Sequence, residues 1–255
     1  MKDIHSAARD GFSQASDAYV SGRPGYPQDV DDWLAGEMGA GAGRTIVDLG
    51  AGTGKFTRHL LGTGARVIAV EPVDEMLAQC HAACPAADHR SGNATSIPLE
   101  DESVDGLYCA QAFHWFASAE ALAEIRRVLK PGSALGLIWN VRDETSPWVS
   151  DLSRIMAPYE DRTPRFHEGQ WRRVFPAPGY SSLQEREFSH VHTGGFDQVV
   201  ADRVLSVSFI AAQPESEQSA VRSQVHALKT AYPELAADPV SFPYRTLVAW
   251  TRKLA

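Results

Sequence analysis

The sequence predicts an α/β fold organised around a mostly parallel β-sheet. From about residue 41 to residue 140, short apolar runs typical of buried strands alternate with stretches of helical periodicity, which is the pattern of consecutive strand–helix–strand units. The first apolar run, residues 46–49, ends in a loop with glycine at positions 50, 52 and 54. In a doubly wound sheet such a loop lies at the carboxyl end of the first strand, where nucleotides bind.

The glycine loop does not match the two common phosphate-binding motifs. The dinucleotide fingerprint requires a small residue at position 55, which is Lys55. A Walker loop would require glycine at Leu49 and a hydroxyl side chain at Phe56. An acid, Asp48, precedes three alternating glycines, which let the main chain approach a ligand closely because glycine has no Cβ. The motif therefore favours a ligand that is held without phosphate contacts.

The second predicted strand, residues 65–72, also ends in an acid. Glu71 follows Asp48 by 23 residues. A carboxylate at this place can accept hydrogen bonds from both hydroxyls of a ribose, and bonds to a charged acceptor are about twice as strong as neutral ones. NAD enzymes use a similar acid, so the order of Glu71 after this particular loop is what makes it informative.

A helix joins the fourth and fifth predicted strands. The expected elements here are a strand over 103–110, a helix over 119–129 and a strand over 134–140. Pro131 and Gly132 would end the helix and reverse the chain. Residues at the carboxyl end of a central strand face the ligand crevice, which places Gln111, Ala112 and His114 there.

Residues 144–176 interrupt the alternation of strands and helices. Trp148, Leu152 and Met156 recur at helical spacing, and this apolar stripe is equally consistent with packing against the core and with a face turned to a substrate. The remaining expected elements are a short helix over 170–174, a sixth strand over 183–192, helices over 196–206 and 215–231, and a last strand over 242–253.

The segment VDLGAGTG, residues 47–54, resembles motif I of the class I S-adenosylmethionine-dependent methyltransferases. Further markers follow in order: Glu71, the Leu-Lys-Pro-Gly turn at 129–132, and Gly92-Asn93-Ala94, which resembles the adenine-edge motif although aspartate is commoner at position 93. Phe12, Tyr19 and Arg23-Pro24-Gly25-Tyr26-Pro27 resemble the amino-terminal helix and turn of the trans-aconitate methyltransferase-like subgroup. The motif match covers about residues 5–143 well and the remainder loosely.

The resemblance implies a Rossmann-like, seven-stranded, mostly parallel sheet with an antiparallel last strand, helices on both faces and a helical lid. The antiparallel strand would form a hairpin with the sixth. We expect a single domain over 1–255. Its parts would be an amino-terminal helical arm over 1–40, a cofactor-binding core over 41–143, a substrate-lid insertion over 144–180 and the rest of the sheet with its helices over 181–255.

The same resemblance implies methyl transfer from S-adenosyl-L-methionine, leaving S-adenosyl-L-homocysteine, to a small-molecule acceptor, most simply at a carboxylate or hydroxyl oxygen. In-line alignment would supply much of the rate acceleration. The implied cofactor-binding residues are Tyr19, Arg23, Asp48, Gly50, Ala51, Gly52, Gly54, Glu71, Pro72, Met76, Asn93, Ala94, Gln111 and Ala112. The candidate substrate residues are Tyr26, Trp115, Trp139 and Trp148.

His114 is the candidate catalytic base, because histidine titrates near neutrality. It lies in the aromatic run Phe113-His114-Trp115-Phe116, so packing, a backbone hydrogen bond or a cofactor contact are the simpler roles. Two other functions remain open at this point: an NAD-dependent oxidoreductase of the same fold, and a relative that binds the cofactor without turnover.

Composition restricts the partners. A net charge of −8 disfavours a nucleic-acid groove, and no apolar run approaches the ~20 residues of a membrane span, so we expect a cytoplasmic protein without nucleic-acid or membrane partners. Two sets of residues have side chains that can bind a metal: Cys80 and Cys84 with His89, and the pair His190 and His192. The cysteine site lacks a second well-spaced pair, and the two histidines are more simply explained as the polar face of a strand, so no metal is expected. The acceptor and the oligomeric state are not specified by the sequence.

Overall fold

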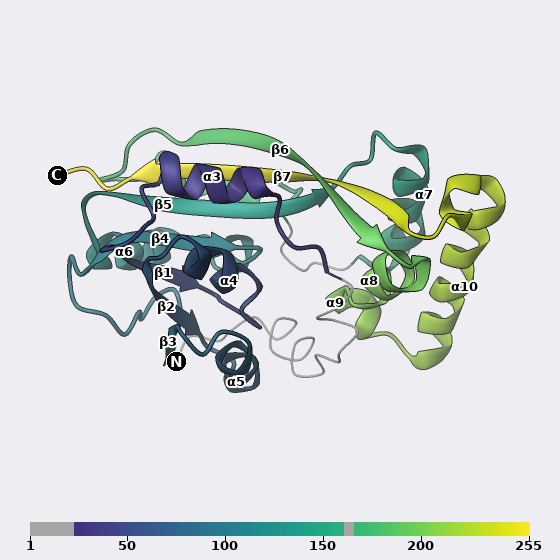
Figure 1. Cartoon of the computed structure of the whole chain (residues 1–255), viewed down its shortest axis with the longest axis horizontal. Helices are drawn as coiled ribbons and strands as arrows, with labels where there is room; N and C mark the ends of the chain where they lie inside the picture. The colour runs from purple at the N-terminus through teal and green to yellow at the C-terminus, as the bar shows by residue number, and fades with distance from the viewer. Residues whose placement is uncertain (1–22, 161–165) are drawn as a thin grey trace. The chain divides into compact units, whose positions relative to one another are not determined.

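The computed structural model describes residues 23–160 and 166–255 and contains one seven-stranded sheet (Figure 1). The strand order is β3-β2-β1-β4-β5-β7-β6. The strands are β1 (Thr45–Leu49), β2 (Arg66–Glu71), β3 (Asp88–Ser91), β4 (Val104–Ala110), β5 (Leu129–Arg142), β6 (Gln184–Gly194) and β7 (Val240–Arg252). The arrows of Figure 1 show β7 running against its neighbours β5 and β6. The predicted mostly parallel sheet with an antiparallel last strand is confirmed.

The register of the parallel strands brings their carboxyl ends to one edge. Asp48 on β1 lies beside Ala69 on β2 and Tyr108 on β4. The central strands are buried on both faces, which is why they read as continuous apolar runs rather than as alternating patterns. By contrast β6, at the edge, is largely exposed and polar.

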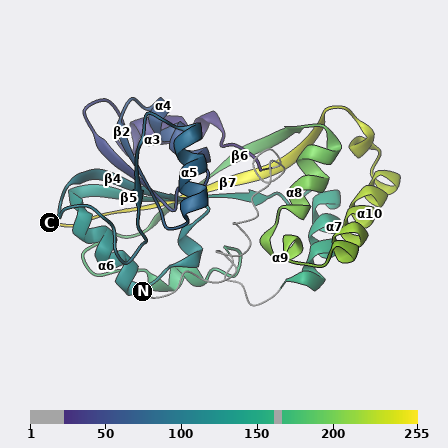
Figure 2. The ribbon, with the colours of Figure 1, turned by 90° about the horizontal axis from the view of Figure 1, so that it is seen from below.

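Helices cover both faces of the parallel strands, as predicted. The helices are α3 (Gln28–Gly36), α4 (Lys55–Gly62), α5 (Asp74–Ala83), α6 (Ala119–Val128), α7 (Pro147–Met156), α8 (Asp202–Leu205), α9 (Ser208–Ala211) and α10 (Glu215–Ala231). Figure 2 shows α3, α4 and α5 on one face and α6 on the other. In the described ranges no helix combines the length and the apolar character needed to cross a bilayer.

The structure changes the bounds of two predicted elements and locates the third strand, which the prediction of seven strands implied without bounds. The fifth strand begins at Leu129 instead of residue 134, because Leu129 already pairs with Val104 and the Pro-Gly pair forms an irregularity inside the strand, where Gly132 has φ +78°. The predicted helix over 196–206 begins as a π-helical turn, Asp197–Ala201, before α8. Strand β3 had no predicted bounds, because its residues are half-buried or exposed and carry little apolar signal.

The chain forms two compact units, which we call unit 1 and unit 2. Among the described residues, unit 1 contains 23–25, 140–160 and 189–245, and unit 2 contains 26–139, 166–188 and 246–255. Unit 2 therefore holds the glycine loop and the parallel strands β1 to β4. A core built from α3, α4 and the sheet stabilises it, with Trp33, Phe56 and Tyr108 among its buried side chains.

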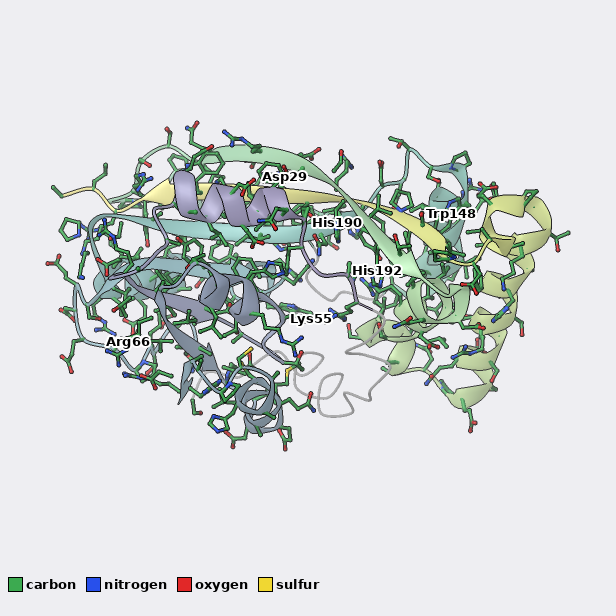
Figure 3. The ribbon with its side chains drawn as sticks, viewed as in Figure 1. Asp29, Lys55, Arg66, Trp148, His190 and His192 are labelled. Carbon is green, nitrogen blue, oxygen red and sulfur yellow. The ribbon has the colours of Figure 1, made fainter. Side chains whose placement is uncertain are left out.

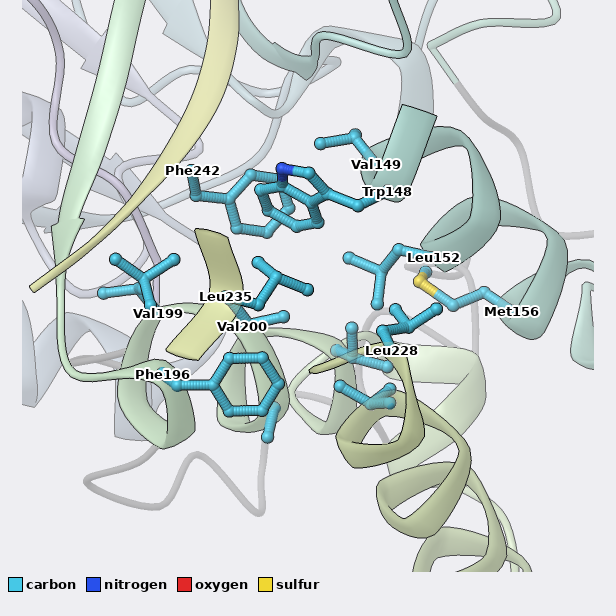
Figure 4. Packing of buried hydrophobic residues seen from close by; sticks show 14 of the residues in the cluster. Trp148, Val149, Leu152, Met156, Phe196, Val199, Val200, Leu228, Leu235 and Phe242 are labelled. Atoms are coloured by element: carbon cyan, nitrogen blue, oxygen red, sulfur yellow. The ribbon is translucent and has the colours of Figure 1, made fainter. Parts of the chain in front are cut away.

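Unit 1 has a hydrophobic core of its own. Trp148 on α7, labelled in Figure 3, packs against Phe242 on β7 with ring centroids 4.7 Å apart. The core also includes Leu152, Val200 and Leu228 (Figure 4). The apolar stripe on α7 is thus buried inside unit 1, which accounts for its spacing by packing.

Candidate functional site

The glycine loop follows β1 in unit 2 and uses its three glycines for backbone shape. Gly50, Gly52 and Gly54 have φ values of +74°, +57° and +85°, a region that other residues rarely adopt. A Cβ on Gly50 would come within 2.8 Å of the Cβ of Ala112. The loop therefore lies against the carboxyl end of β4, and Gly54 caps the amino terminus of α4.

Asp48 is completely buried next to this loop. Its Oδ2 accepts a hydrogen bond from the Thr57 hydroxyl on α4 at 2.7 Å, whereas its Oδ1 has no hydrogen-bond partner among the described residues. Burial raises the pKa of Asp48 to about 7; the Thr57 bond opposes this shift and the nearby Glu71 adds to it. A buried carboxylate oxygen without a donor is unfavourable, so this atom suits a ligand that brings a positive charge or an N–H group.

Glu71 ends β2 and braces the glycine loop. Its Oε2 accepts the N–H of Gly52 at 2.9 Å and its Oε1 accepts the N–H of Val73 at 3.1 Å. Burial raises the pKa of Glu71, while these two backbone bonds act in the opposite direction. Each carboxylate oxygen has a second lone pair, so Glu71 can still accept hydrogen bonds from a bound diol.

Asn93 lies in a tight turn after β3. Its Oδ1 accepts hydrogen bonds from the backbone N–H and the hydroxyl of Thr95, at 2.9 and 3.0 Å. This is the local turn role open to asparagine, and it engages the side-chain oxygen that an adenine contact would use. Gly92 is required beside it, since a Cβ there would lie 2.6 Å from the Cδ of Pro98. Ala94 is buried.

The turn after β4 is strained at Gln111, which has φ +57° although it is not glycine. Its N–H donates to the carbonyl of Ile138 at 2.8 Å, which holds the turn against β5. Such outliers cost on the order of 1–3 kcal/mol and cluster at functional sites. The strain at Gln111 therefore supports the placement of a ligand at this end of the sheet.

His114 follows in a short 3₁₀ turn, Phe113–Trp115, and contacts Trp139 on β5. The indole Nε1–H of Trp139 donates to Nδ1 of His114 at 3.1 Å. Because Nδ1 accepts this proton, a neutral His114 carries its own proton on Nε2. In this arrangement Nε2 carries a proton and can only donate a hydrogen bond, whereas a general base needs a nitrogen that can accept a proton.

Trp139 itself is fully buried in an aromatic cluster. Its ring lies 4.5 Å from Trp171 and 4.8 Å from Phe166, centroid to centroid. Trp115, by contrast, is half-buried beside the His114 ring at 5.3 Å. The sequence pattern did not single out Phe166 or Trp171 as part of this cluster.

Of the other predicted site residues that the structure describes, some lie in unit 2 around the glycine loop and its core, and two lie in unit 1. Met76 is buried beside the loop, 3.9 Å from a Cβ built on Gly52, and Tyr26 packs edge-on against Phe56 in the core of unit 2 at 5.0 Å. Pro72 is half-buried after Glu71, and Ala51 is buried within the loop. Trp148 and Arg23 belong to unit 1, where the Arg23 Nη2 donates to the carbonyl of Ser206 at 3.3 Å. Tyr19 lies outside the described residues.

Thr57 is a site residue that the sequence pattern did not reveal. It is fully buried and positions Asp48, nine residues earlier in the chain. Its only signal was a polar side chain three residues before Leu60, on the apolar face of the helix that follows the loop. Cys80 and Cys84 lie against the same loop, where burial raises the pKa of Cys80 to about 12. Within the described ranges there is no group of three side chains suited to a metal ion.

Comparison with known proteins agrees with this geometry. A family profile described as "Methyltransferase domain" matches residues 47–137. A Schizosaccharomyces pombe protein named as an uncharacterized methyltransferase-like protein is 38% identical over 237 residues, covering 92% of each chain. A shorter match, 34% identical over 99 residues and covering 38% of this chain and 39% of the relative, is to a malonyl-[acyl-carrier protein] O-methyltransferase of Pectobacterium atrosepticum.

The fold is shared with solved structures as well. A structure from Anaeromyxobacter dehalogenans superposes on 91% of this chain and 98% of its own, with TM-score 0.67 and 24% identity. The match to the yeast relative over nearly its whole length, the domain match and the glycine loop with its two acids lead to one conclusion. The chain belongs to the methyltransferase family and is an S-adenosylmethionine-dependent methyltransferase of class I.

Proposed function

We propose that the protein transfers the methyl group of S-adenosylmethionine to an oxygen atom of a small-molecule acceptor. The observation that carries the cofactor part is the pair of buried acids, Asp48 and Glu71, beside the glycine loop, neither of which forms an ion pair with a described residue. S-adenosylmethionine carries a sulfonium and an ammonium group, and both are attracted to carboxylates. When bound, it supplies a methyl group that is already electrophilic.

The described residues fit this cofactor. Asp48 Oδ1, which has no donor among the described residues, would accept from the ammonium group. Glu71 would accept from the ribose hydroxyls, and the three glycines let the main chain lie against the ligand. Asn93 and Ala94 would line the adenine, with the Asn93 amide group as donor because its oxygen is engaged by Thr95.

The site's own chemistry is mainly that of alignment. A methyl transfer needs the acceptor atom in line with the methyl group at near-attack distance, and positioning of this kind can supply ~7–11 kcal/mol of the barrier. With its proton on Nε2, His114 would donate a hydrogen bond to the acceptor and hold it in place, rather than remove a proton. Such a role suits a carboxylate acceptor, which has no proton to lose.

Methylation at oxygen has support from one relative, whose name describes an O-methyltransferase acting on a malonyl group. The resemblance to trans-aconitate methyltransferase-like proteins points to the same kind of acceptor. We include Trp115 as the acceptor-facing aromatic side chain, because Trp139 is buried in the cluster and Trp148 in unit 1.

The test combines binding and turnover. Calorimetry with S-adenosylhomocysteine should give a one-to-one complex with the wild-type chain. Labelled S-adenosylmethionine incubated with a panel of carboxylic acids, phenols and amines should yield a methyl ester. Absence of cofactor binding would refute the proposal altogether, and transfer to amines alone would refute methylation at oxygen.

To separate the two roles of His114, the variants His114→Gln and His114→Ala should be compared. Glutamine keeps an N–H donor but is no base, so it should retain much more turnover than alanine if His114 positions the acceptor. Equal losses in the two variants, in the range of about 10²–10⁴-fold, would favour a general base. Cofactor affinity should remain unchanged in both.

A further inference from the structure

Unit 1 contains a group of buried and half-buried hydrogen-bond donors that the cofactor site does not use. Arg142 ends β5, Arg203 lies on α8 and Tyr244 lies on β7. The three residues come from parts of the chain that are separated by 41 residues or more in sequence. All three belong to unit 1, so they are part of one compact body. We call them the arginine cluster.

Several donors of the arginine cluster have no acceptor among the described residues. The Nε and Nη1 atoms of Arg203 and the hydroxyl of Tyr244 are buried and have no hydrogen-bond partner among the described residues. The only hydrogen bond of the Arg142 side chain in the described structure is from Nη1 to the sulfur of Met156, at 2.9 Å, and sulfur is a weak acceptor. Buried donors of this kind cost free energy unless something accepts from them.

The two guanidinium groups also repel each other. Burial lowers the pKa of Arg142, and the charge of Arg203 is the next largest cause in the same direction. Tyr244, Glu144 and Glu160 act against this shift through space, but by less. Two like charges held together in a partly buried position are unfavourable without a counter-charge.

The nearest acids in sequence are engaged elsewhere. Asp202, next to Arg203, pairs with Arg222 at 2.9 Å. Asp143, next to Arg142, accepts from the backbone and hydroxyl of Thr145 at 3.2 and 2.8 Å. The counter-charge is therefore not supplied by these neighbouring carboxylates.

Further basic groups lie around the arginine cluster. The Arg23 Nη2 donates to the carbonyl of Ser206 at 3.3 Å, one turn beyond Arg203. The His190 ring lies 6.2 Å from the Tyr244 ring, centroid to centroid. His192 shares the face of β6 with His190, since alternate residues of a strand point the same way, and Figure 3 labels both along this strand. The surroundings are thus those of an anion site.

We propose that Arg142, Arg203 and Tyr244 bind the anionic group, carboxylate or phosphate, of a small molecule. A guanidinium presents a planar fork of N–H donors that matches two oxygens of such a group, and the tyrosine hydroxyl adds a third donor. The site lies within unit 1, and the inference stands independently of the methyl acceptor.

Binding can be measured on the full chain without cofactor. Thermal unfolding is followed with inorganic phosphate, succinate or citrate, each against sodium chloride at equal ionic strength, because a ligand that binds the folded state raises the unfolding temperature. We expect at least one of these anions to stabilise the wild-type chain beyond the chloride control. Stabilisation by phosphate alone would assign a phosphate group, and stabilisation by the carboxylates alone would assign a carboxylate. No stabilisation by any of them would overturn the inference.

Variants locate the effect. Arg203→Leu and Tyr244→Phe should each weaken binding of the effective anion, by roughly 10–100-fold for the arginine. Arg222→Gln, which removes an arginine already paired with Asp202, is the matched control and should bind as the wild type does. Without anion, Arg203→Leu should unfold at the wild-type temperature or above, because it removes a half-buried charge that has no ion-pair partner among the described residues. A lower unfolding temperature together with unchanged anion affinity would mean that Arg203 is structural only. If Arg203→Leu does not fold, Tyr244→Phe decides by its anion affinity alone.

The cofactor provides an independent readout. Calorimetry with S-adenosylhomocysteine is carried out on the same variants and should give the wild-type affinity for Arg203→Leu. If S-adenosylhomocysteine binds and none of the anions does, the arginine cluster is not a ligand site and the proposed function stands. If anions bind and the product does not, the proposed function fails while the anion site remains.

Discussion

Asp48 should make the ligand-free protein less stable as the pH rises. The folded state raises the pKa of this carboxyl from 3.8 to about 7, mainly by burial. Between those two values the folded chain holds a proton that the unfolded chain has released. Stability is therefore lost as pH increases through this window, the reverse of the behaviour of a carboxylate in an ion pair.

The size of this loss of stability follows from the pKa shift of Asp48. Each pH unit within the window corresponds to about 1.4 kcal/mol, so Asp48 alone should lower the free energy of unfolding by about 2.5 kcal/mol between about pH 5 and pH 8. The variant Asp48→Asn keeps the shape of the side chain and cannot ionise. It should match or exceed the wild type at the higher pH and should lose less stability across this range.

Urea unfolding of both proteins at several pH values measures this difference. Asp105→Asn is a matched control on β4, because Lys130 and Arg44 pair with this acid and its pKa is lowered against the effect of burial. Its loss should destabilise the protein at both ends of the range. If the stability curves of Asp48→Asn and wild type run parallel, burial does not set the protonation of Asp48. The Asp48→Asn variant should also bind S-adenosylhomocysteine more weakly, because the ammonium group of this ligand loses its counter-charge.

Three further outcomes are expected. Glu71→Ala should lose on the order of 1.5–3 kcal/mol of S-adenosylhomocysteine affinity by calorimetry, and unchanged affinity would remove Glu71 from the site. Trp139→Phe should release the fixed tautomer of His114, which nitrogen NMR of the imidazole detects, whereas Trp171→Phe should not, because that indole N–H has no partner in the described structure. Gly54→Ala should lower the unfolding temperature, since φ is +85° and the new methyl would lie 3.0 Å from a buried cysteine sulfur.

The arrangement of the first half of the chain follows from local sequence. A glycine loop between an apolar run and a helix, and acids at strand ends, are patterns of neighbouring residues, so the sequence alone places β1, α4 and β2. The seven strands and the antiparallel β7 followed from the family resemblance and were confirmed. The element bounds that were wrong depend on long-range pairing, as in β5, whose first residue is set by its partner Val104.

Interactions between side chains far apart in the sequence were decided by the tertiary structure alone. The Trp139 indole fixes the proton of His114 from 25 residues away, and no periodicity signals this contact. Asp48 and Thr57 meet because a loop folds back, which leaves the other carboxylate oxygen buried and without a hydrogen-bond partner among the described residues. The arginine cluster, separated along the chain, exists only once unit 1 has packed. Sequence patterns report which face of an element is apolar, whereas the partner of each polar group is set by how the elements pack together.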